Sequence, residues 1–289
     1  MDVIITDCAL PSNEFAEAWK SIKIGEEVRE RLVAQAMLTL TLRRQFAFEV
    51  IPVHGLIVLA GPPGTGKTTL ARGLANEVAR RLPTEKTHFV EIDPHALTSA
   101  ALGKSQKGVA NLFHQVIPEL AARGPCVVLL DEVETLAADR QRMSLEANPI
   151  DVHRATDAAL SGIDVLARNQ RNTLLIATTN FPKAVDPALL SRADLIEHMV
   201  LPEAEIRGKI IEDTLSRLAE KWHKVAELKK QMQLFVKASE GLDGRQLRKA
   251  IITAAASSME SAQDLNKLKP EQLVSSLKRA AKDSREAAR

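Results

Sequence analysis

Short apolar runs alternate with longer amphipathic segments over most of the chain. Five of the runs have the length of β-strands, and they are Leu56–Ala60, His88–Asp93, Cys126–Asp131, Thr173–Thr179 and Ile196–Leu201. Between them, segments such as Lys67–Arg81 and Val109–Ala122 place apolar residues at i, i+3 and i+4, as amphipathic helices do. Strands that alternate with helices predict βαβ crossovers and a parallel sheet covered on both faces. We therefore predict an α/β fold with a doubly wound, parallel, five-stranded sheet.

The pattern changes after Pro202, where only helical periods remain. They cover roughly residues 203–222, 224–239, 243–260 and 270–284, and no strand candidate lies among them. We expect two domains: a large α/β domain over 1–202, which includes a short N-terminal linker over 1–50, and a small all-helical domain over 203–289.

Composition narrows the class of protein. The 289 residues carry 39 Lys and Arg against 37 Asp and Glu, a net charge of +2, which is too balanced for a surface built mainly to bind nucleic acid or anionic membrane. Seven Phe, two Trp and no Tyr disfavour a module that stacks bases on aromatic rings. The seven histidines are scattered without the spacing of a zinc site.

Targeting signals are missing from the pattern as well. No apolar run approaches the ~20 residues of a membrane span, and the N-terminus MDVIITDCAL carries acid where a signal peptide carries base. Cys8 and Cys126 make no disulfide framework, and the apolar run that begins at Cys126 predicts a buried thiol. We expect a cytoplasmic protein that does not associate with membranes.

The sequence GPPGTGKT at 61–68 follows a predicted strand and opens a predicted helix, which is the context of a phosphate-binding loop, the Walker A motif. Its glycines allow positive φ angles that turn backbone N–H groups toward a phosphate, and the helix dipole adds positive potential. Lys67 is expected to reach the β- and γ-phosphates, and the Thr68 hydroxyl to ligate Mg²⁺. The predicted ATP contacts are Gly61, Pro62, Pro63, Gly64, Thr65, Gly66, Lys67, Thr68 and Thr69.

Two further strands are predicted to end in polar residues that complement this loop. VVLLDE at 127–132, a Walker B motif, places Asp131 to hold Mg²⁺ and Glu132 to orient and deprotonate the attacking water. LLIATTN at 174–180 brings Asn180 to the carboxyl end of a strand, where ligands of open α/β sheets bind. We therefore predict that Asn180 lies beside the γ-phosphate and positions water.

This order of motifs resembles the AAA+ ATPases, in which a phosphate loop, a strand ending in Asp-Glu, a strand-end Asn and a helical lid follow one another. The resemblance implies a ring-forming ATPase whose sites are shared between neighbours. It also implies that Arg192, in DPALLSRAD at 186–194, completes the neighbouring subunit's site; the other reading is a surface arginine that pairs with Asp194. The lid is expected to supply a second arginine, Arg245, with Arg248 as the fallback.

A narrower resemblance rests on several short motifs together: LPSNEF at 10–15 with Trp19, DEVE at 131–134, SRAD at 191–194 and GLDGRQLR at 241–248. With these the chain resembles the pachytene-checkpoint ATPase family (thyroid-hormone-receptor interactor thirteen) over nearly all of residues 10–258. The resemblance implies a homohexamer that remodels HORMA-domain proteins by gripping their N-terminal segment in a central pore. A short form of this kind suits bacterial antiphage signalling operons, where related ATPases separate a HORMA protein from its nucleotidyltransferase.

The chain departs from that family in two places. Only about 50 residues precede the phosphate loop, so we expect substrate recognition by the ATPase ring or by a separate adaptor. The stretch TSAALGKSQKG at 98–108, which corresponds to the pore loop, has Leu102 and Gly103 at its tip where the family has a large aromatic. Leucine grips less area than Trp or Tyr, which predicts low-force remodelling. A second pore-facing stretch is expected at Asp139–Pro149. Ile22–Ile24, ahead of the first long helix, is assigned to the adenine pocket.

Two other functions stay open at this point. The first is a nucleotide-switched DNA-binding AAA+ module of the loader or initiator type. Lys104 and Lys107, beside the expected pore loop, favour this alternative. Against it stand the net charge of +2 and the scarcity of aromatics. A scaffold that binds ATP without hydrolysis is disfavoured by the complete set of Lys67, Asp131 and Glu132 with Asn180 and Arg192.

Overall fold

The computed structural model describes residues 3–82, 86–93, 104–138 and 149–287. They form two compact units. The first is built on a sheet and spans 1–22, 26–61 and 67–199; the second holds 200–289 with two short pieces, 23–25 and 62–66.

The first unit contains a six-stranded sheet in the order β1-β3-β4-β5-β2-β6. Its strands are β1 (Ile4–Leu10), β2 (Leu56–Ala60), β3 (Thr87–Ile92), β4 (Cys126–Leu130), β5 (Thr173–Thr179) and β6 (Leu195–His198). All neighbouring strands are parallel except β1, which pairs antiparallel with β3. Strands β2, β4 and β5 are buried along their whole length, as expected of a parallel sheet covered on both faces.

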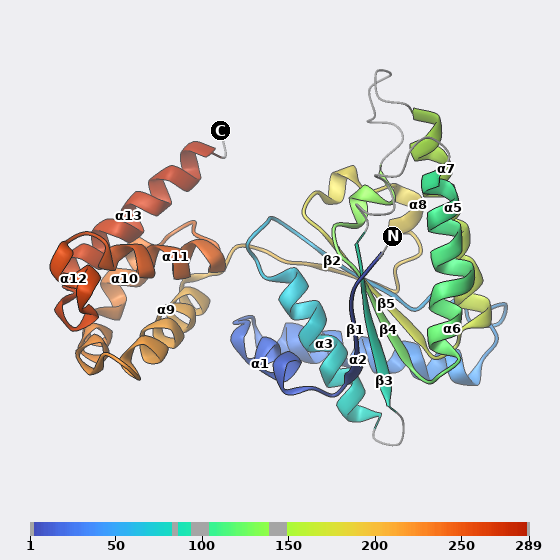
Figure 1. Ribbon diagram of the computed structural model, residues 1–289, viewed down its shortest axis with the longest axis horizontal. Helices are drawn as coiled ribbons and strands as arrows, with labels where there is room; N and C mark the ends of the chain where they lie inside the picture. Colours follow the sequence, from blue (N-terminus) through green and yellow to red (C-terminus); the bar gives the residue numbers. More distant parts are fainter. Residues whose placement is uncertain (1–2, 83–85, 94–103, 139–148, 288–289) are drawn as a thin grey trace. The chain divides into compact units, whose positions relative to one another are not determined.

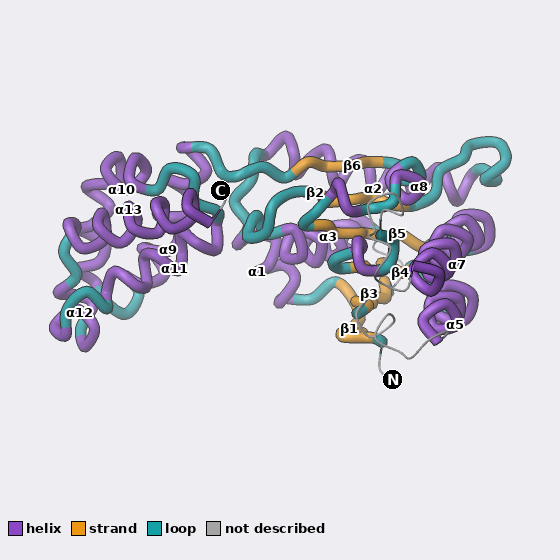
Figure 2. Tube along the Cα trace, turned by 90° about the horizontal axis from the view of Figure 1, so that it is seen from above, coloured by secondary structure: helices purple, strands orange, loops and turns teal. Residues whose placement is uncertain are grey.

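Helices cover both faces of this sheet. Helices α5, α6 and α7 lie on one side, and α1 and α3 lie on the other (Figures 1 and 2). The helices of the unit are α1 (Asn13–Ser21), α2 (Glu26–Gln45), α3 (Lys67–Arg81), α5 (Lys104–Asn111), α6 (Ile117–Ala121), α7 (Pro149–Asn169) and α8 (Pro187–Leu190). Shorter turns are the π-helical Leu112–Val116 and the 3-10 segments Val133–Thr135 and Pro182–Ala184.

The segment up to residue 50, expected to be a linker, is folded from residue 3 onward. It forms β1, α1 and α2, and β1 makes the sheet six-stranded and mixed rather than five-stranded and parallel. The burial of β1 alternates along the strand, because successive side chains point to opposite faces of the sheet and one face of this edge strand is more exposed than the other. That weak alternation is a much fainter signal than the continuous apolar runs of the inner strands. Helix α1 begins where Ser12 Oγ accepts the Phe15 N–H at 3.3 Å, a side-chain cap.

The helix expected over 109–122 differs in its interior. It begins at Lys104 and is interrupted by the π-helical turn Leu112–Val116 before α6. Pro118 follows this turn; proline has no N–H to donate and its ring clashes with the carbonyl four residues earlier, which fits the widened turn. Gly162 of α7 lies against Phe113 of the turn, since a Cβ at Gly162 would be 2.4 Å from the Phe113 Cβ.

The second unit is all-helical in the described residues. Its helices are α9 (Ala204–Ala219), α10 (Met232–Ala238), α11 (Gly244–Ala255), α12 (Met259–Gln263) and α13 (Pro270–Ala287), with 3-10 segments at His223–Gln231 and Leu265–Lys267. The expected helix 224–239 is therefore a 3-10 segment followed by α10, and the expected 243–260 divides into α11 and α12. Fully buried Ile211, Phe235, Leu247 and Leu273 form the centre of its own apolar core.

Candidate nucleotide site

The phosphate loop is a turn between β2 and α3 that only glycines allow. Gly61, Gly64 and Gly66 have φ angles of 155°, 81° and 87°, which residues with a Cβ rarely adopt. At Gly61 a Cβ would lie 2.1 Å from the Met199 carbonyl oxygen, so the close approach of the chain also excludes a side chain. The Thr65 hydroxyl donates to the Pro62 carbonyl at 2.9 Å and closes the turn. This backbone fits the cradle that a phosphate requires.

Lys67 is the first residue of α3, and its side chain folds back on the loop. The residue is 5% exposed, and its Nζ donates to the Gly61 carbonyl at 2.8 Å. A buried ammonium at the N-terminus of a helix adds its charge to the positive end of the helix dipole. The predicted phosphate ligand therefore lies where an anion is favoured.

The two predicted Mg²⁺ ligands are in contact. Asp131 follows the last residue of β4, and its Oδ1 accepts the Thr68 hydroxyl at 2.8 Å. The same oxygen accepts the hydroxyl of Thr178 from β5. A hydroxyl and a carboxylate are oxygen ligands of the kind that Mg²⁺ takes, so these residues fit the expected ion.

Glu132 has an unusual backbone. Its φ and ψ are 53° and 54°, in the left-handed region, which costs a residue with a side chain on the order of 1–3 kcal/mol. Two contacts hold it there: its N–H donates to Thr178 Oγ1 at 3.1 Å, and its Oε1 accepts Asn180 Nδ2 at 3.1 Å. Glu132 and Asn180, which the sequence assigns to separate roles, are therefore in direct contact.

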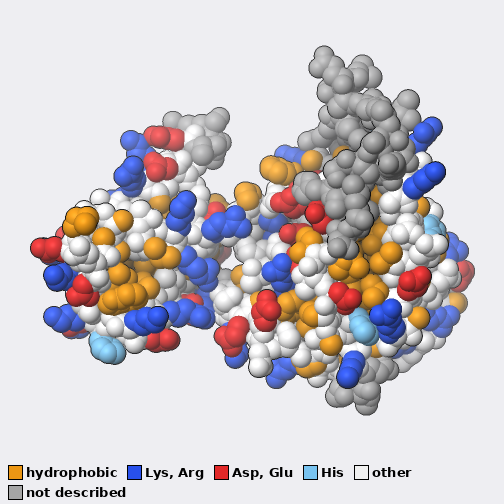
Figure 3. Space-filling view, viewed as in Figure 1, with side chains coloured by type: hydrophobic (Ala, Val, Ile, Leu, Met, Phe, Trp, Pro, Cys, Tyr) orange, Lys and Arg blue, Asp and Glu red, His pale blue; other side chains and the backbone are white. Residues whose placement is uncertain are grey.

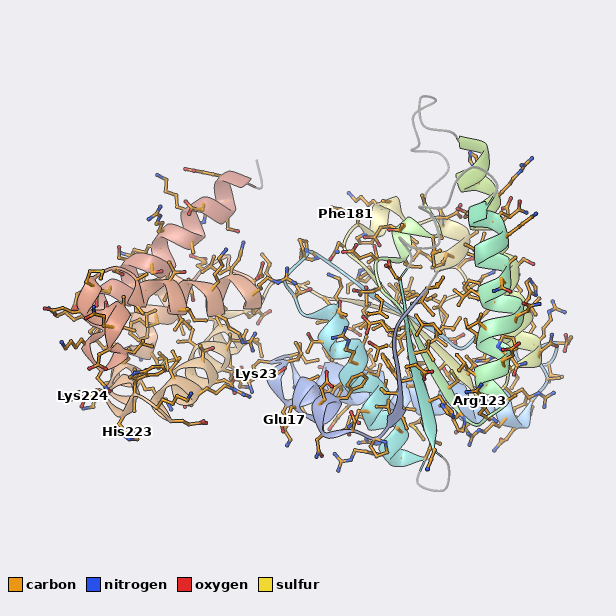
Figure 4. The ribbon with its side chains drawn as sticks, in the orientation of Figure 1. Glu17, Lys23, Arg123, Phe181, His223 and Lys224 are labelled. Atoms are coloured by element: carbon orange, nitrogen blue, oxygen red, sulfur yellow. The ribbon has the colours of Figure 1, made fainter. Side chains whose placement is uncertain are left out.

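Glu134 also contacts Asn180, through the backbone of that residue. Its Oε1 accepts the Asn180 backbone N–H at 3.1 Å, and its Oε2 is buried with no hydrogen-bond partner among the described residues. Asn180 is thus held by two carboxylates, one on its side chain and one on its backbone. Phe181 follows it, and this residue is 61% exposed (Figure 4).

Arg192 pairs with Asp164 of α7 and not with Asp194. Its Nε and Nη2 donate to the two oxygens of Asp164 at 2.7 and 2.8 Å, and Nη1 donates to the Ala188 carbonyl at 2.7 Å. The hydrogen bonds from Arg192 lower the pKa of Asp164. In the described residues Arg192 is thus fixed to α7 and α8, and its predicted role toward a neighbouring site stays a prediction.

Asp194 has a structural role instead. Its carboxylate accepts three successive backbone N–H groups, from His54 at 3.0 Å, Gly55 at 2.7 Å and Leu56 at 3.0 Å. Burial raises the pKa of Asp194, and those three donors act in the opposite direction. The carboxylate therefore anchors the entry to β2, the strand that leads into the phosphate loop.

The remaining predicted residues lie elsewhere. Arg245 is exposed, one residue into α11, and Arg248 is partly buried, so that desolvation lowers the pKa of Arg248. Ile22 is buried, and its carbonyl accepts the Arg29 guanidinium. Leu102, Gly103 and residues 139–148 lie outside the described residues. The assignments of these residues to nucleotide or substrate stay predictions.

Sequence reasoning missed Thr178, Glu134 and Asp164. Side chains alternate along a strand, so Thr178 shares a face with Asn180, two residues on, and that spacing could have identified it. Glu134 lies in the DEVE motif, but only its contact with Asn180 gives it a role. Asp164 carries no local signal, because its partner Arg192 is 28 residues away in the chain.

Three properties of the described residues bear on the class of protein. Among them no helix has the length and apolar character needed to cross a bilayer. Within the same part of the chain, no three His, Cys, Asp or Glu side chains gather as a metal site would require. Cys126 is buried, which raises the pKa of its thiol to about 12, and it forms no disulfide.

Comparison with known proteins identifies the family of this chain and several similar proteins. The model of the "ATPase family associated with various cellular activities (AAA)" matches residues 57–201. CD-NTase-associated protein 6 of Pseudomonas aeruginosa is 48% identical over 273 residues, which cover 94% of this chain and 90% of that protein. The pachytene checkpoint protein 2 homolog of Arabidopsis thaliana is 32% identical over 73% of this chain, which spans 46% of that longer relative.

A solved structure extends the likeness to the fold. A chain in the structure of the Escherichia coli MS115-1 HORMA:CdnC:Trip13 complex superposes with a TM-score of 0.75 at 21% identity, and the match covers 95% of this chain and 94% of that one. At this identity the likeness establishes the fold alone. The α/β sheet with an appended helical unit is therefore common to both chains.

Proposed function

The chain belongs to the AAA ATPase family, together with CD-NTase-associated protein 6 and the pachytene checkpoint proteins, and from this premise we propose that it hydrolyses ATP to remodel HORMA-domain proteins. The observation that carries the proposal is the 48% identity to CD-NTase-associated protein 6 over 94% of the chain. The substrate is a HORMA-domain protein bound to a nucleotidyltransferase. Separating the HORMA-domain protein from the nucleotidyltransferase restrains a bacterial antiphage signal.

The residues of the site divide the chemistry among them. Bound Mg²⁺–ATP supplies the scissile phosphoanhydride and an ion that neutralises phosphate charge. The loop N–H groups and Lys67 hold the phosphates, while Thr68 and Asp131 offer oxygens to the ion. Glu132 accepts the proton of the attacking water, and Asn180 fixes the orientation of the Glu132 carboxylate.

The proposed role of Arg192 requires a ring of identical subunits, and the homohexamer that the family resemblance implies is such a ring. Three of the five N–H donors of its guanidinium bind Asp164 and Ala188, so the fork is fixed in direction while two donors remain for a ligand. A guanidinium held in this way suits a neighbour's γ-phosphate, where it stabilises charge in the transition state. A ring of identical head-to-tail interfaces gives every site such a neighbour.

The DNA-binding alternative receives less support. Basic and acidic side chains are mixed over the visible face of the helical unit in Figure 3 and do not form a single basic surface. The chain has a net charge of +2, whereas binding to phosphates depends on clustered Lys and Arg. Duplex DNA is therefore a comparator in the test below.

The first test is the ATPase rate with Mg²⁺, measured alone, with a HORMA-domain protein encoded beside this gene, and with duplex DNA. We expect stimulation by the HORMA protein and none by DNA, with Glu132→Gln as the blank. Stimulation by DNA alone would overturn the proposed substrate and leave the ATPase in place. Equal rates in all three reactions would count against both substrates.

Mixing two inactive variants tests the sharing of sites. Arg192→Ala is expected to bind ATP normally and to lose about a thousandfold in hydrolysis, the contribution of an arginine finger. In rings mixed equally with Glu132→Gln, a subunit with an intact Glu132 meets an intact Arg192 at about a quarter of the sites, so hydrolysis should recover to about a quarter of the wild-type rate.

The control and the contrary result for this experiment are direct. Exposed Arg123 (Figure 4) provides the matched variant, Arg123→Ala, which should hydrolyse ATP at the wild-type rate. Subunit exchange is verified by mixing chains that carry two different tags. If exchanged rings stay inactive, Arg192 acts within its own subunit and the proposed shared site is wrong.

A further inference from the structure

The hydroxyl of Thr178 contacts both acids that follow β4. It donates to Asp131 Oδ1, and it accepts the Glu132 backbone N–H at 3.1 Å. A threonine hydroxyl has one proton and two lone pairs, so a single group can do both at once. The hydroxyl is therefore a bridge between the proposed metal ligand and the proposed general base.

The register of the sheet explains why this residue occupies that position. In the parallel pair of β4 and β5, Leu130 lies opposite Ala177. The next residues, Asp131 and Thr178, are therefore neighbours where β4 ends. Thr178 is only 2% exposed, and its β-branched side chain has few rotamers in a strand. The hydroxyl is held at a fixed place by the sheet itself.

From this geometry we propose that Thr178 is a positioning residue for Asp131 and Glu132, an inference that rests on the proposed ATPase site. Asp131 Oδ1 accepts two hydroxyls, those of Thr68 and Thr178. If the Thr68 hydroxyl ligated an ion, the Thr178 hydroxyl would still hold the Asp131 carboxylate in its orientation. The Thr178 Oγ1 also accepts the Glu132 backbone N–H, and so it anchors the Glu132 backbone in its left-handed conformation, with φ at 53°.

A matched control lies on the same strand. Thr173 is fully buried at the start of β5, opposite Cys126, and its hydroxyl has no hydrogen-bond partner among the described residues. The changes Thr178→Val and Thr173→Val both replace a buried hydroxyl with a methyl group of similar size. They differ in whether that hydroxyl contacts the two acids.

The first measurement is steady-state hydrolysis. Thr178→Val is expected to lower kcat on the order of 10–100-fold, as loss of a group that orients a metal ligand does, and to leave KM for ATP within about threefold because the phosphate loop is unchanged. Thr178→Ser should restore kcat to within about threefold of the wild type, whereas Thr178→Ala should not. Thr173→Val should match the wild type.

The second measurement does not depend on turnover. Binding of a fluorescent ATP analogue is titrated with Mg²⁺, and the concentration for half-maximal binding should rise about tenfold in Thr178→Val and stay unchanged in Thr173→Val. Thermal unfolding verifies that each variant is folded. If the valine variant does not fold, the Ser and Ala variants isolate the hydroxyl in the same two assays.

The contrary results separate this inference from the proposed function. Wild-type kcat and wild-type Mg²⁺ dependence in Thr178→Val or Thr178→Ala would overturn the positioning role, as would equal losses in Thr173→Val. A wild-type chain that binds Mg²⁺–ATP without hydrolysing it would contradict the proposed function. The Mg²⁺ titration would then still decide whether Thr178 acts on Asp131.

Discussion

Replacing Lys67 with alanine is expected to abolish ATP binding at concentrations that saturate the wild-type chain. The ammonium of Lys67 lies over the phosphate loop, bound to the Gly61 carbonyl at 2.8 Å, and the residue is 5% exposed. Hydrogen bonds to charged groups contribute about 1.5–3 kcal/mol each. Losing two of them, to the β- and γ-phosphates, therefore predicts a loss of affinity of about 10²–10⁴-fold. Equilibrium binding of a fluorescent ATP analogue measures this change.

Two companion variants make the result for Lys67 interpretable. Lys67→Met keeps the volume of the side chain and removes only the charge, so it should lose the same affinity without the cavity that alanine leaves in a buried position. Lys224→Ala removes an exposed lysine of the helical unit (Figure 4) and should bind ATP normally. Wild-type affinity in both Lys67 variants would mean that the phosphates are held elsewhere.

The sequence alone predicts the parts of the site that consist of residues adjacent in the chain. The loop at 61–68 and the acids Asp131 and Glu132 are contiguous strings at strand ends, and α3 begins and ends at the expected residues, Lys67 and Arg81. Their chemistry depends on local backbone conformation, which glycine and a buried strand specify by themselves. The structure places Thr68 against Asp131 as those strings predict.

Contacts that depend on strand register or on packing were not accessible in this way. Thr178 meets Asp131 only because β4 and β5 pair with Leu130 opposite Ala177. Arg192 was expected beside Asp194 if it lay on the surface, yet it binds Asp164, because Asp194 is occupied by the N–H groups that lead into β2. A sequence shows which residues are adjacent along the chain, whereas the contacts of Thr178 and Arg192 form only in the folded protein.

Edge elements were missed for a different physical reason. Strand β1 lies at the edge of the sheet with one face largely exposed, so from Ile4 to Ala9 its residues alternate between partly buried and exposed, and only Leu10 is buried. Its alternating pattern is shared by many irregular segments, whereas the inner strands are buried at every residue. The strength of the hydrophobic signal therefore follows the number of faces and neighbours that a strand buries.

Changing Glu132 to glutamine is expected to leave ATP binding at the wild-type level and to lower hydrolysis by about 10²–10⁴-fold, the usual contribution of a general base. The substitution keeps the shape of the side chain, and its Oε1 can still accept Asn180 Nδ2, so the geometry of the site should persist. Single-turnover hydrolysis and equilibrium binding separate the two effects. The ring should then stay ATP-bound on its HORMA substrate, which a pull-down in Mg²⁺–ATP detects.

The informative comparison for Glu132 is Glu134, the other carboxylate in contact with Asn180. Glu134 accepts the Asn180 backbone N–H at 3.1 Å, so it orients the same residue through its backbone, whereas Glu132 contacts the Asn180 side chain. If Glu132 is the base, Glu134→Gln should reduce hydrolysis far less than Glu132→Gln, and exposed Glu119→Gln should not reduce it at all. Should Glu132→Gln retain more than about a tenth of the wild-type rate while Glu134→Gln is inactive, the base is Glu134 and the roles of the two acids are exchanged. Both variants preserve the shape of the side chain that contacts Asn180. The two hydrolysis rates therefore show which carboxylate accepts the proton of the attacking water.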